Sequence, residues 1–150
     1  IPTGGAHAVQ VRNKGKGTFI NTTIAGDIYN STGSFNNCVI RNRSNNYGIT
    51  GNVAGKVLAT TNTSPGQSSE KITVYNSEHG HLLFPTWTEK NGQDDLDWMK
   101  SLSSSQTHTI TIEKSKHNNE TGIYNVHIYA ASGDGNWNAE NTIASLILTF

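Results

Sequence analysis

Alternation of apolar and polar residues limits the fold of this sequence more than any other feature. In 123-IYNVHIYA-130 every even-numbered residue is apolar or aromatic, whereas the odd-numbered residues include Asn125 and His127. Similar alternation marks 71-KITVYN-76, 107-THTITIEK-114 and 142-TIASLILTF-150. A period of two indicates strands with one buried face, so the sequence predicts an all-β protein. On this pattern His127 lies on the less apolar face, where we expect a hydrogen-bonded structural histidine.

Turn residues separate these strands at the spacing of an Ig-like β-sandwich. They occur at Asn91-Gly92, between Asn119 and Gly122, and between Gly133 and Gly135. The segment 94-DDLDWMKSL-102 fits either a helix or a strand that follows the Asn91-Gly92 turn. We therefore predict that residues 69–150 form an Ig-like β-sandwich head.

The first part of the chain contains a weak repeat, F-x-N-x-x-I. It occurs at Phe19 to Ile24 and again, 16 residues later, at Phe35 to Ile40. Short apolar segments between Gly, Asn and Ser turns are typical of stacked β rungs. Residues 1–68 are thus expected to form a short β-helical or intertwined β neck, although irregular hairpins would also fit. So narrow a stack buries little by itself, which favours a homotrimer, and Cys38 fits as a small buried residue.

Charge also divides the chain. Residues 1–68 have a formal charge of +5 and residues 69–150 a formal charge of −5, while the whole chain is neutral. The segment 61-TNTSPGQSS-69 has the composition of a linker, so two domains are expected, residues 1–68 and 69–150. Neutrality and the lack of a basic segment rich in aromatic residues argue against nucleic acid. No apolar run reaches the roughly 18 residues that span a bilayer, so we expect no membrane partner.

An acidic cluster, 86-TWTEKNGQDDLDWMK-100, has several possible roles. Asp94 and Asp97 could resemble a glycosidase pair, but such enzymes need a cleft and one carboxyl with a raised pKa. A zinc site could be built from Glu78, His79 and His81, but the sequence offers no further ligand of matched spacing. The segment 91-NGQDDLD-97 lacks the full alternation of oxygen ligands of a calcium loop. We therefore predict no catalytic residue, metal or cofactor. Asp94 and Asp95 are expected to accept backbone N–H bonds and to fix the hairpin.

This cluster resembles the GBS Bsp-like repeat, found in streptococcal surface proteins, cell-wall lysins and phage-related proteins. The resemblance spans about residues 70–132, and 101-SLSSSQTHT-109 departs from the family's usual Asp-Gly turn. It rests on Trp87, Gly92, Gln93, Asp94, Asp95 and Trp98, and on His117, Glu120, Gly122, Tyr124, His127 and Tyr129. The resemblance implies an Ig-like sandwich that accompanies catalytic or anchoring domains at Gram-positive cell walls, with the acidic run as part of its fold.

The loop 132-SGDGNWNAEN-141 is the best candidate for a binding site. Trp137 could stack on a sugar ring while Asp134, Asn136 and Asn138 bond its hydroxyls. Alternatively, Trp137 folds back onto the sandwich or packs at a subunit contact. Trp87 and Trp98 are expected in the core.

Together these features favour a fragment of a phage tail receptor-binding protein at the virion tail tip, from a phage of a streptococcus-like host. It would bind host cell-wall polysaccharide as a homotrimer, without enzymatic activity. The first alternative is a cell-wall-targeting module of a secreted Gram-positive hydrolase or surface protein. The second is a small enzyme that acts on the same glycan.

Overall fold

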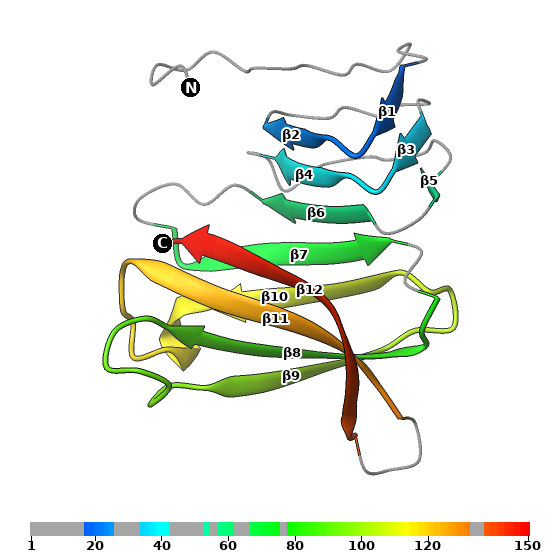
Figure 1. Ribbon diagram of the computed structural model, residues 1–150. Helices are drawn as coiled ribbons and strands as arrows, with labels where there is room; N and C mark the ends of the chain where they lie inside the picture. Colours follow the sequence, from blue (N-terminus) through cyan, green and yellow to red (C-terminus); the bar gives the residue numbers. More distant parts are fainter. Residues whose placement is uncertain are drawn as a thin grey trace.

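The computed structural model describes residues 17–25, 34–42, 53–54, 57–61, 67–75, 78–132 and 137–150. These residues form twelve strands and one short 3₁₀ helix, so the all-β prediction is confirmed (Figure 1). No helix in these ranges is long and apolar enough to cross a membrane. The elements are β1 (Thr18–Ile20), β2 (Thr23–Ala25), β3 (Ser34–Asn36), β4 (Val39–Asn42), β5 (Val53–Ala54), β6 (Val57–Thr61), β7 (Ser69–Tyr75), β8 (His81–Thr88), β9 (Asp97–Leu102), β10 (His108–Glu113), η1 (Lys114–Lys116), β11 (Ile123–Ala131) and β12 (Ala139–Thr149).

The first six strands stack as parallel pairs. Strands β1, β3 and β5 form one parallel sheet, and β2, β4 and β6 lie parallel beside them in a second. Figure 1 shows the resulting layers, in which a bend joins β1 to β2 and another joins β3 to β4. Neighbouring layers are 16 residues apart at Thr18–Ser34 and 18 apart at Phe35–Val53.

Each residue that the two copies of the F-x-N-x-x-I repeat share has a structural role in these layers. Phe19 pairs in register with Phe35, and their rings stack with centroids 5.4 Å apart. The Asn positions of the repeat, Asn21 and Asn37, both have φ of 51° at the bend between strands. Asparagine tolerates this left-handed conformation better than most residues. The Ile positions, Ile24 and Ile40, also pair in register and are buried.

Cys38 follows the second bend and is buried, as expected of a small apolar residue. Its thiol lies 3.3 Å from the carbonyl oxygen of Asn36 and 3.4 Å from that of Phe19. The thiol therefore ties two successive layers together.

Strand β6 joins the stack to the remainder of the chain. It lies parallel to β4 on one side and antiparallel to β7 on the other, with Leu58 opposite Val74. The segment expected as a linker, residues 61–69, thus connects two hydrogen-bonded neighbours, and residues 62–66 of it are outside the described ranges. The division at residue 68 stays a prediction, but backbone pairing crosses it.

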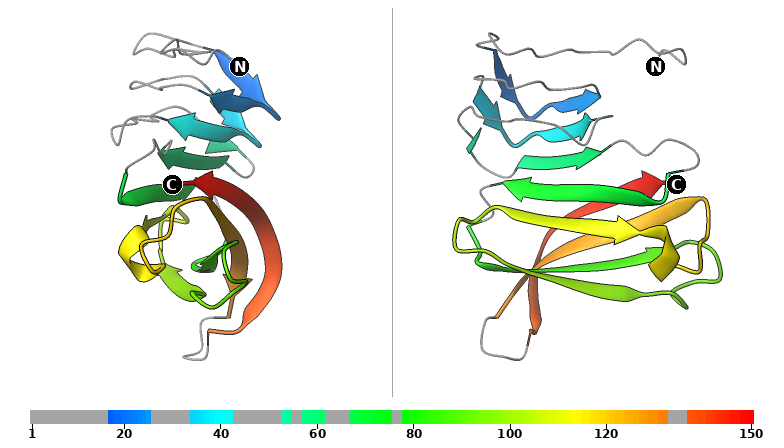
Figure 2. Two further views of the ribbon diagram at one scale, coloured as in Figure 1. Left: turned by 90° about the vertical axis from the view of Figure 1, so that its left-hand side faces the viewer. Right: turned by 180° about the vertical axis from the view of Figure 1, so that it is seen from behind.

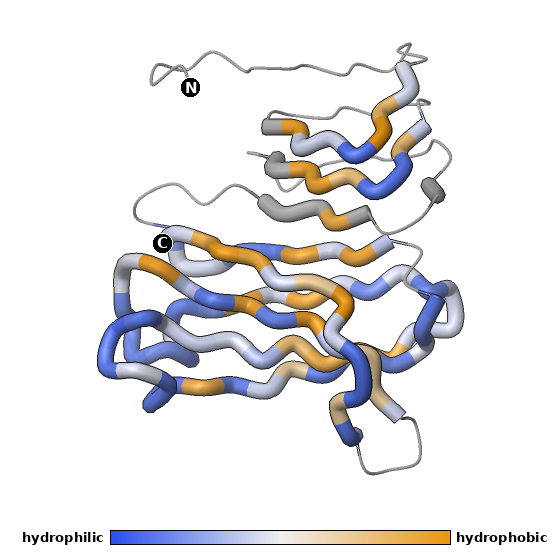
Figure 3. The backbone as a smooth tube through the Cα atoms, in the orientation of Figure 1, coloured by the Kyte–Doolittle hydropathy of each residue, from blue (hydrophilic) through white to orange (hydrophobic). Residues whose placement is uncertain are grey.

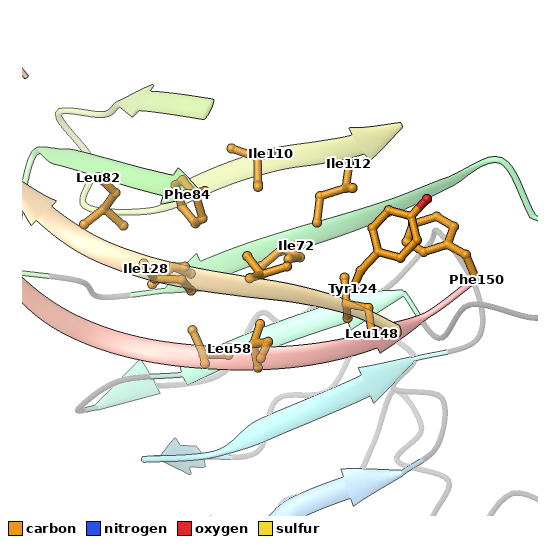
Figure 4. Packing of buried hydrophobic residues seen from close by; sticks show 13 residues of the cluster. Leu58, Ile72, Leu82, Phe84, Ile110, Ile112, Tyr124, Ile128, Leu148 and Phe150 are labelled. Atoms are coloured by element: carbon orange, nitrogen blue, oxygen red, sulfur yellow. The ribbon is translucent and has the colours of Figure 1, made fainter. Parts of the chain in front are cut away.

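Two sheets pack on one core, and the first of them continues into the stacked layers. One has the strand order β10-β7-β6-β4-β2 and the other the order β12-β11-β8-β9. Figure 2 (left) looks roughly along the strands and shows β10 and β12 on opposite sides of the core. Side chains from both sheets meet in one cluster that includes Leu58, Ile72, Phe84, Ile112 and Tyr124 (Figure 4).

The alternation seen in the sequence matches the burial of the strands. In β11 the residues Tyr124, Val126, Ile128 and Ala130 are buried, whereas the intervening residues are partly or fully exposed. Figure 3 shows this as alternating hydropathy along the strand. The expected strands appear at β7, β10, β11 and β12. The segment 94–102, which fitted either a helix or a strand, contains strand β9. The expected turn at 133–135 lies outside the described residues.

Candidate functional site

The four-stranded sheet has one face on the core and one face that points outward. Residues directly opposite in antiparallel strands share a face. Leu83 pairs with both Lys100 and Tyr129, and Pro85 pairs with Trp98, so all five lie on the outward side. We call this surface the outer face. It consists of His81, Leu83, Pro85 and Trp87 of β8, Trp98, Lys100 and Leu102 of β9, Ile123, Asn125, His127, Tyr129 and Ala131 of β11, and Ser145, Ile147 and Thr149 of β12.

Figure 1 views the molecule with the outer face toward the reader, and Figure 2 (right) has β7 and β10 in front instead.

Aromatic rings form a connected row on the outer face. Trp98 and Tyr129 stack with centroids 6.4 Å apart and planes 28° apart. The Nδ1 of His127 and the Tyr129 hydroxyl form a hydrogen bond of 3.2 Å, whose donor depends on the histidine tautomer. The His127 ring also meets Trp87 edge to face at 4.8 Å. The predicted hydrogen-bonded role of His127 is therefore confirmed, and the histidine links the two tryptophans.

Trp137 lies against the same face. Its ring meets His81 edge to face, with centroids 4.9 Å apart, and the Nζ of Lys100 lies 5.6 Å from its centroid. The Trp137 side chain is half-buried, so it has folded back onto the sheet. Of the residues expected to act with it, Asn138 is exposed, and Asp134 and Asn136 lie outside the described ranges. The binding role of these four residues stays a prediction.

Large apolar side chains are exposed on the outer face rather than spread over the head. In residues 67–75, 78–132 and 137–150 the exposed large hydrophobics are Trp98, Leu102, Ile123 and Ile147, and all four belong to it. From His81 to Trp87 the face extends six residues, or about 20 Å at about 3.3 Å per residue. An exposed apolar surface of this kind marks a site of contact with a ligand or partner.

The expectation of Trp98 in the core is wrong, because Trp98 is 48% exposed. Alternation along β9 allows only one of Trp98 and Met99 to face inward. Met99 lies opposite the buried Phe84 and packs on the core, so Trp98 points outward with Pro85. Trp87 is half-buried on the outer face and is not part of the core cluster either.

Asp95 of the acidic run is buried and has a structural role. Its two carboxylate oxygens accept the backbone N–H of Thr88 at 3.1 and 3.2 Å. The Nδ1 of His117 lies 3.0 Å from Oδ2 of Asp95 and 3.1 Å from its carbonyl oxygen. This confirms that Asp95 fixes the hairpin through a backbone N–H, whereas Asp94 is exposed.

Glu120 extends this buried polar corner. The Thr88 hydroxyl donates to Glu120 Oε2 at 2.6 Å, and the Tyr124 hydroxyl donates to the Glu120 carbonyl at 2.7 Å. Lys90 approaches the same carboxylate at 4.0 Å. Burial raises the pKa of Tyr124 to about 12, and the neighbouring Asp95 and Glu120 charges add to the effect.

The Asp95–His117 pair resembles half of a catalytic triad, but it is enclosed. Both side chains are about 1% exposed, and His117 Nε2 has no hydrogen-bond partner in the described structure. A substrate could not reach either group without unfolding the corner. An open groove of about 380 Å³ lies nearby, but its lining, which includes Ser69, Glu113 and Lys114, is polar and contains no aromatic ring.

Metal binding finds no support in the described ranges, where no three His, Cys, Asp or Glu side chains form a possible site. The His79 carbonyl instead lies 2.7 Å from Nε2 of the buried His108, and His81 packs on Trp137.

Sequence reasoning missed the outer face because it placed Trp87 and Trp98 in the core on the ground that large aromatic residues are usually buried. The signal was present in the same alternation that predicted the strands. In 81-HLLFPTWT-88 and 123-IYNVHIYA-130 the odd-numbered residues contain four aromatic or imidazole rings, His81, Trp87, His127 and Tyr129, which the pairing of β8 with β11 brings to one side of the sheet.

Comparison with known proteins places this architecture in a family. No curated protein matches the chain. A solved polysaccharide deacetylase from Bacillus cereus shares the fold with a TM-score of 0.51 at 15% identity. The match covers 63% of this chain and 30% of that one, so this chain spans less than a third of its length, and the likeness concerns the fold alone. The pattern of the GBS Bsp-like repeat matches residues 59–143, from within β6 to within β12. More than half of the chain lies in that match, and the chain therefore belongs to the GBS Bsp-like repeat family.

Proposed function

We propose that this chain binds bacterial cell-wall saccharide through the outer face of its four-stranded sheet and has no enzymatic activity. The observation that carries this proposal is the exposed ring pair of Trp98 and Tyr129, centred on a face with further rings at Trp87 and Trp137. Aromatic faces stack on the apolar faces of sugar rings. The membership in a family of surface and cell-wall repeats supports a wall ligand.

The shape of the face suits a polymer better than a single sugar. A length of about 20 Å along the strands accommodates several consecutive rings. One sugar contact contributes little, with an affinity near millimolar, or about −4 kcal/mol. Several rings that bind neighbouring units of one chain would raise the avidity. In this proposal Trp137 extends the site at the end of the face near His81, and Asp134, Asn136 and Asn138 supply hydrogen bonds to the sugar.

A substitution at Trp98 tests the proposal. Trp98→Ala removes an exposed ring, so we expect binding to purified Gram-positive cell walls to fall tenfold or more, while the melting temperature changes little. The matched control is Leu102→Ala, four residues along the same strand on the same face and 68% exposed. If the ligand is a sugar chain, the ring matters and the aliphatic side chain does not.

Cosedimentation with walls and binding to the released polysaccharide would measure both variants. Equal losses in Trp98→Ala and Leu102→Ala would indicate an apolar protein interface instead. Wild-type binding by Trp98→Ala would contradict the proposal. Turnover of wall polysaccharide that is lost in Asp94→Asn would contradict the non-enzymatic assignment.

The setting we propose is a receptor-binding fragment at the tip of a phage tail, with residues 1–68 as a β-helical neck and an Ig-like head. The support is the stack of short parallel layers in β1 to β6, whose large buried side chains among the described residues are Ile24, Phe35, Ile40 and Leu58. So few large side chains bury little apolar surface, and a homotrimer would supply the missing burial. Light scattering should give three times the mass of one chain. A monomer would contradict the trimer and favour a cell-wall-targeting module of a secreted hydrolase or surface protein.

A further inference from the structure

The outer face does not share the acidic charge of the head. Residues 69–150 contain ten acidic residues and five lysines. Yet no outward position of β8, β9 or β11 holds an acid, and all of these positions are described. Asp97, the neighbour of Trp98, pairs with the buried Thr86 and so lies on the other side of the sheet. The exposed Glu78 and Glu89 lie in connections beyond the two ends of β8.

Lys100 belongs to this surface and is the central outward residue of the edge strand β9. It is exposed, it lies between Trp98 and Leu102 on the same side of β9, and its Nζ is 5.6 Å from the Trp137 ring centroid. In the described structure no carboxylate forms an ion pair with it. A cation beside an indole is held by the negative face of the ring, which leaves its charge available to a ligand. Among the described residues, Lys100 is therefore a positive charge without an acidic partner, beside the row of rings.

We infer that the ligand of the outer face is an anionic saccharide polymer, whose phosphate or carboxylate groups are bound by Lys100 while its sugar rings stack on Trp98 and Tyr129. The inference rests on the proposed function and specifies its ligand class. The absence of acids from the outward positions of β8, β9 and β11 lowers the repulsion that the head as a whole would exert on such a polymer.

A lysine on an edge strand has a second possible use, since it discourages pairing between sheet edges. Strand β9 is an edge of the four-stranded sheet. That use requires a charge on the protein but none on a ligand, so the experiment must alter the charge of the ligand as well.

The test uses the full chain and one wall polysaccharide that binds it, in three forms. These are the intact polymer, the polymer after complete removal of its pendant phosphate groups, and the polymer after conversion of its carboxylates to neutral amides. The protein variants are Lys100→Met, which keeps the length of the side chain, and Lys100→Arg, which keeps the charge. We expect wild-type binding to fall about five- to tenfold when the relevant anion is removed and to weaken with added salt. Lys100→Met should bind the intact polymer as weakly as wild type binds the neutralised one, and Lys100→Arg should remain near wild type.

The two chemical treatments identify the anion, because only one of them abolishes the difference between wild type and Lys100→Met if a single group is responsible. Equal binding of intact and neutralised polymers by wild type, or unchanged binding by Lys100→Met, would overturn the inference. In either case, weaker wall binding by Trp98→Ala would still support the proposal that the outer face binds saccharide. Unchanged wall binding by Trp98→Ala would contradict both that proposal and the inference about an anionic ligand.

Discussion

The buried polar corner and the outer face of the same head have roles opposite to those that their residue types suggest in the sequence. The corner contains Asp95, His117 and Glu120, residue types that perform catalysis in enzymes, but it is closed to solvent and its groups bond to one another and to backbone. The outer face contains Trp98 and Tyr129, residue types that normally fill cores, but there they are presented outward.

This difference shows that position in the strand, rather than residue type, decides which residues are available for function. The corner closes the β8–β9 connection onto the turn after η1 and onto β11, since Asp95 and Glu120 both bond Thr88. It therefore stabilises the sheet on whose opposite side the rings are displayed. If so, substitutions in the corner should affect stability and substitutions on the outer face should affect binding.

The largest effect on stability is expected for Asp95→Ala. The substitution leaves the Thr88 N–H without its buried acceptor and removes the carboxylate from His117 Nδ1, which keeps only the Asp95 carbonyl oxygen. Lost buried pairs of this kind cost about 2–4 kcal/mol. Chemical denaturation would measure the change in the free energy of unfolding. The control is Asp94→Ala, the adjacent exposed carboxylate, which should change it by less than about 0.5 kcal/mol. Equal effects of the two substitutions would contradict the structural role of the corner.

An intermediate effect is expected for Tyr124→Phe, and it should depend on pH. Tyrosine ionises near pH 10 in an unfolded chain, and burial raises the pKa of Tyr124 to about 12 in the folded chain. Between these values the unfolded state loses a proton that the folded state keeps, so folding stability falls as pH rises from 10 to 12. Wild type should lose more stability than Tyr124→Phe across this window. Parallel pH curves for the two proteins would show that Tyr124 is not shielded as the structure indicates.

The smallest effect is expected for Ile147→Ala on β12. Ile147 is 56% exposed on the outer face and is not in the core cluster, so its loss should change the free energy of unfolding by less than about 0.5 kcal/mol. Binding to walls should also be unchanged, because this side chain has no ring. A marked loss of binding in Ile147→Ala would extend the functional surface to β12 and favour a protein partner.

Much of the fold could be predicted from the sequence because its information is local. Alternation in 123–130 determines which side of β11 is buried, and the Asn residues of the F-x-N-x-x-I repeat mark bends with positive φ. The β6–β7 pair could not be predicted in this way. It depends on contacts across residues 61–69, whose composition resembles a linker.

The site was harder to predict than the fold because it is made by register. That Trp98 lies beside Tyr129 follows from the pairing of β9 with β8 and of β8 with β11, which no single strand encodes. The role of Asp95 was predictable from its place beside the Asn91-Gly92 turn, but its partner His117 is 22 residues away. Sequence alone therefore indicated that the acidic run was structural without indicating what it bonds.

The most direct test of saccharide binding at the outer face is a titration of isotopically labelled protein with soluble wall polysaccharide fragments, followed by NMR. Binding at the proposed site should shift the indole N–H signals of Trp98, Trp87 and Trp137 and the amides of β8, β9 and β11 around them, with little change in β7 and β10. Shifts concentrated in β7, β10 and the groove beside Ser69 and Lys114, or no shifts at concentrations that saturate binding to walls, would contradict the account.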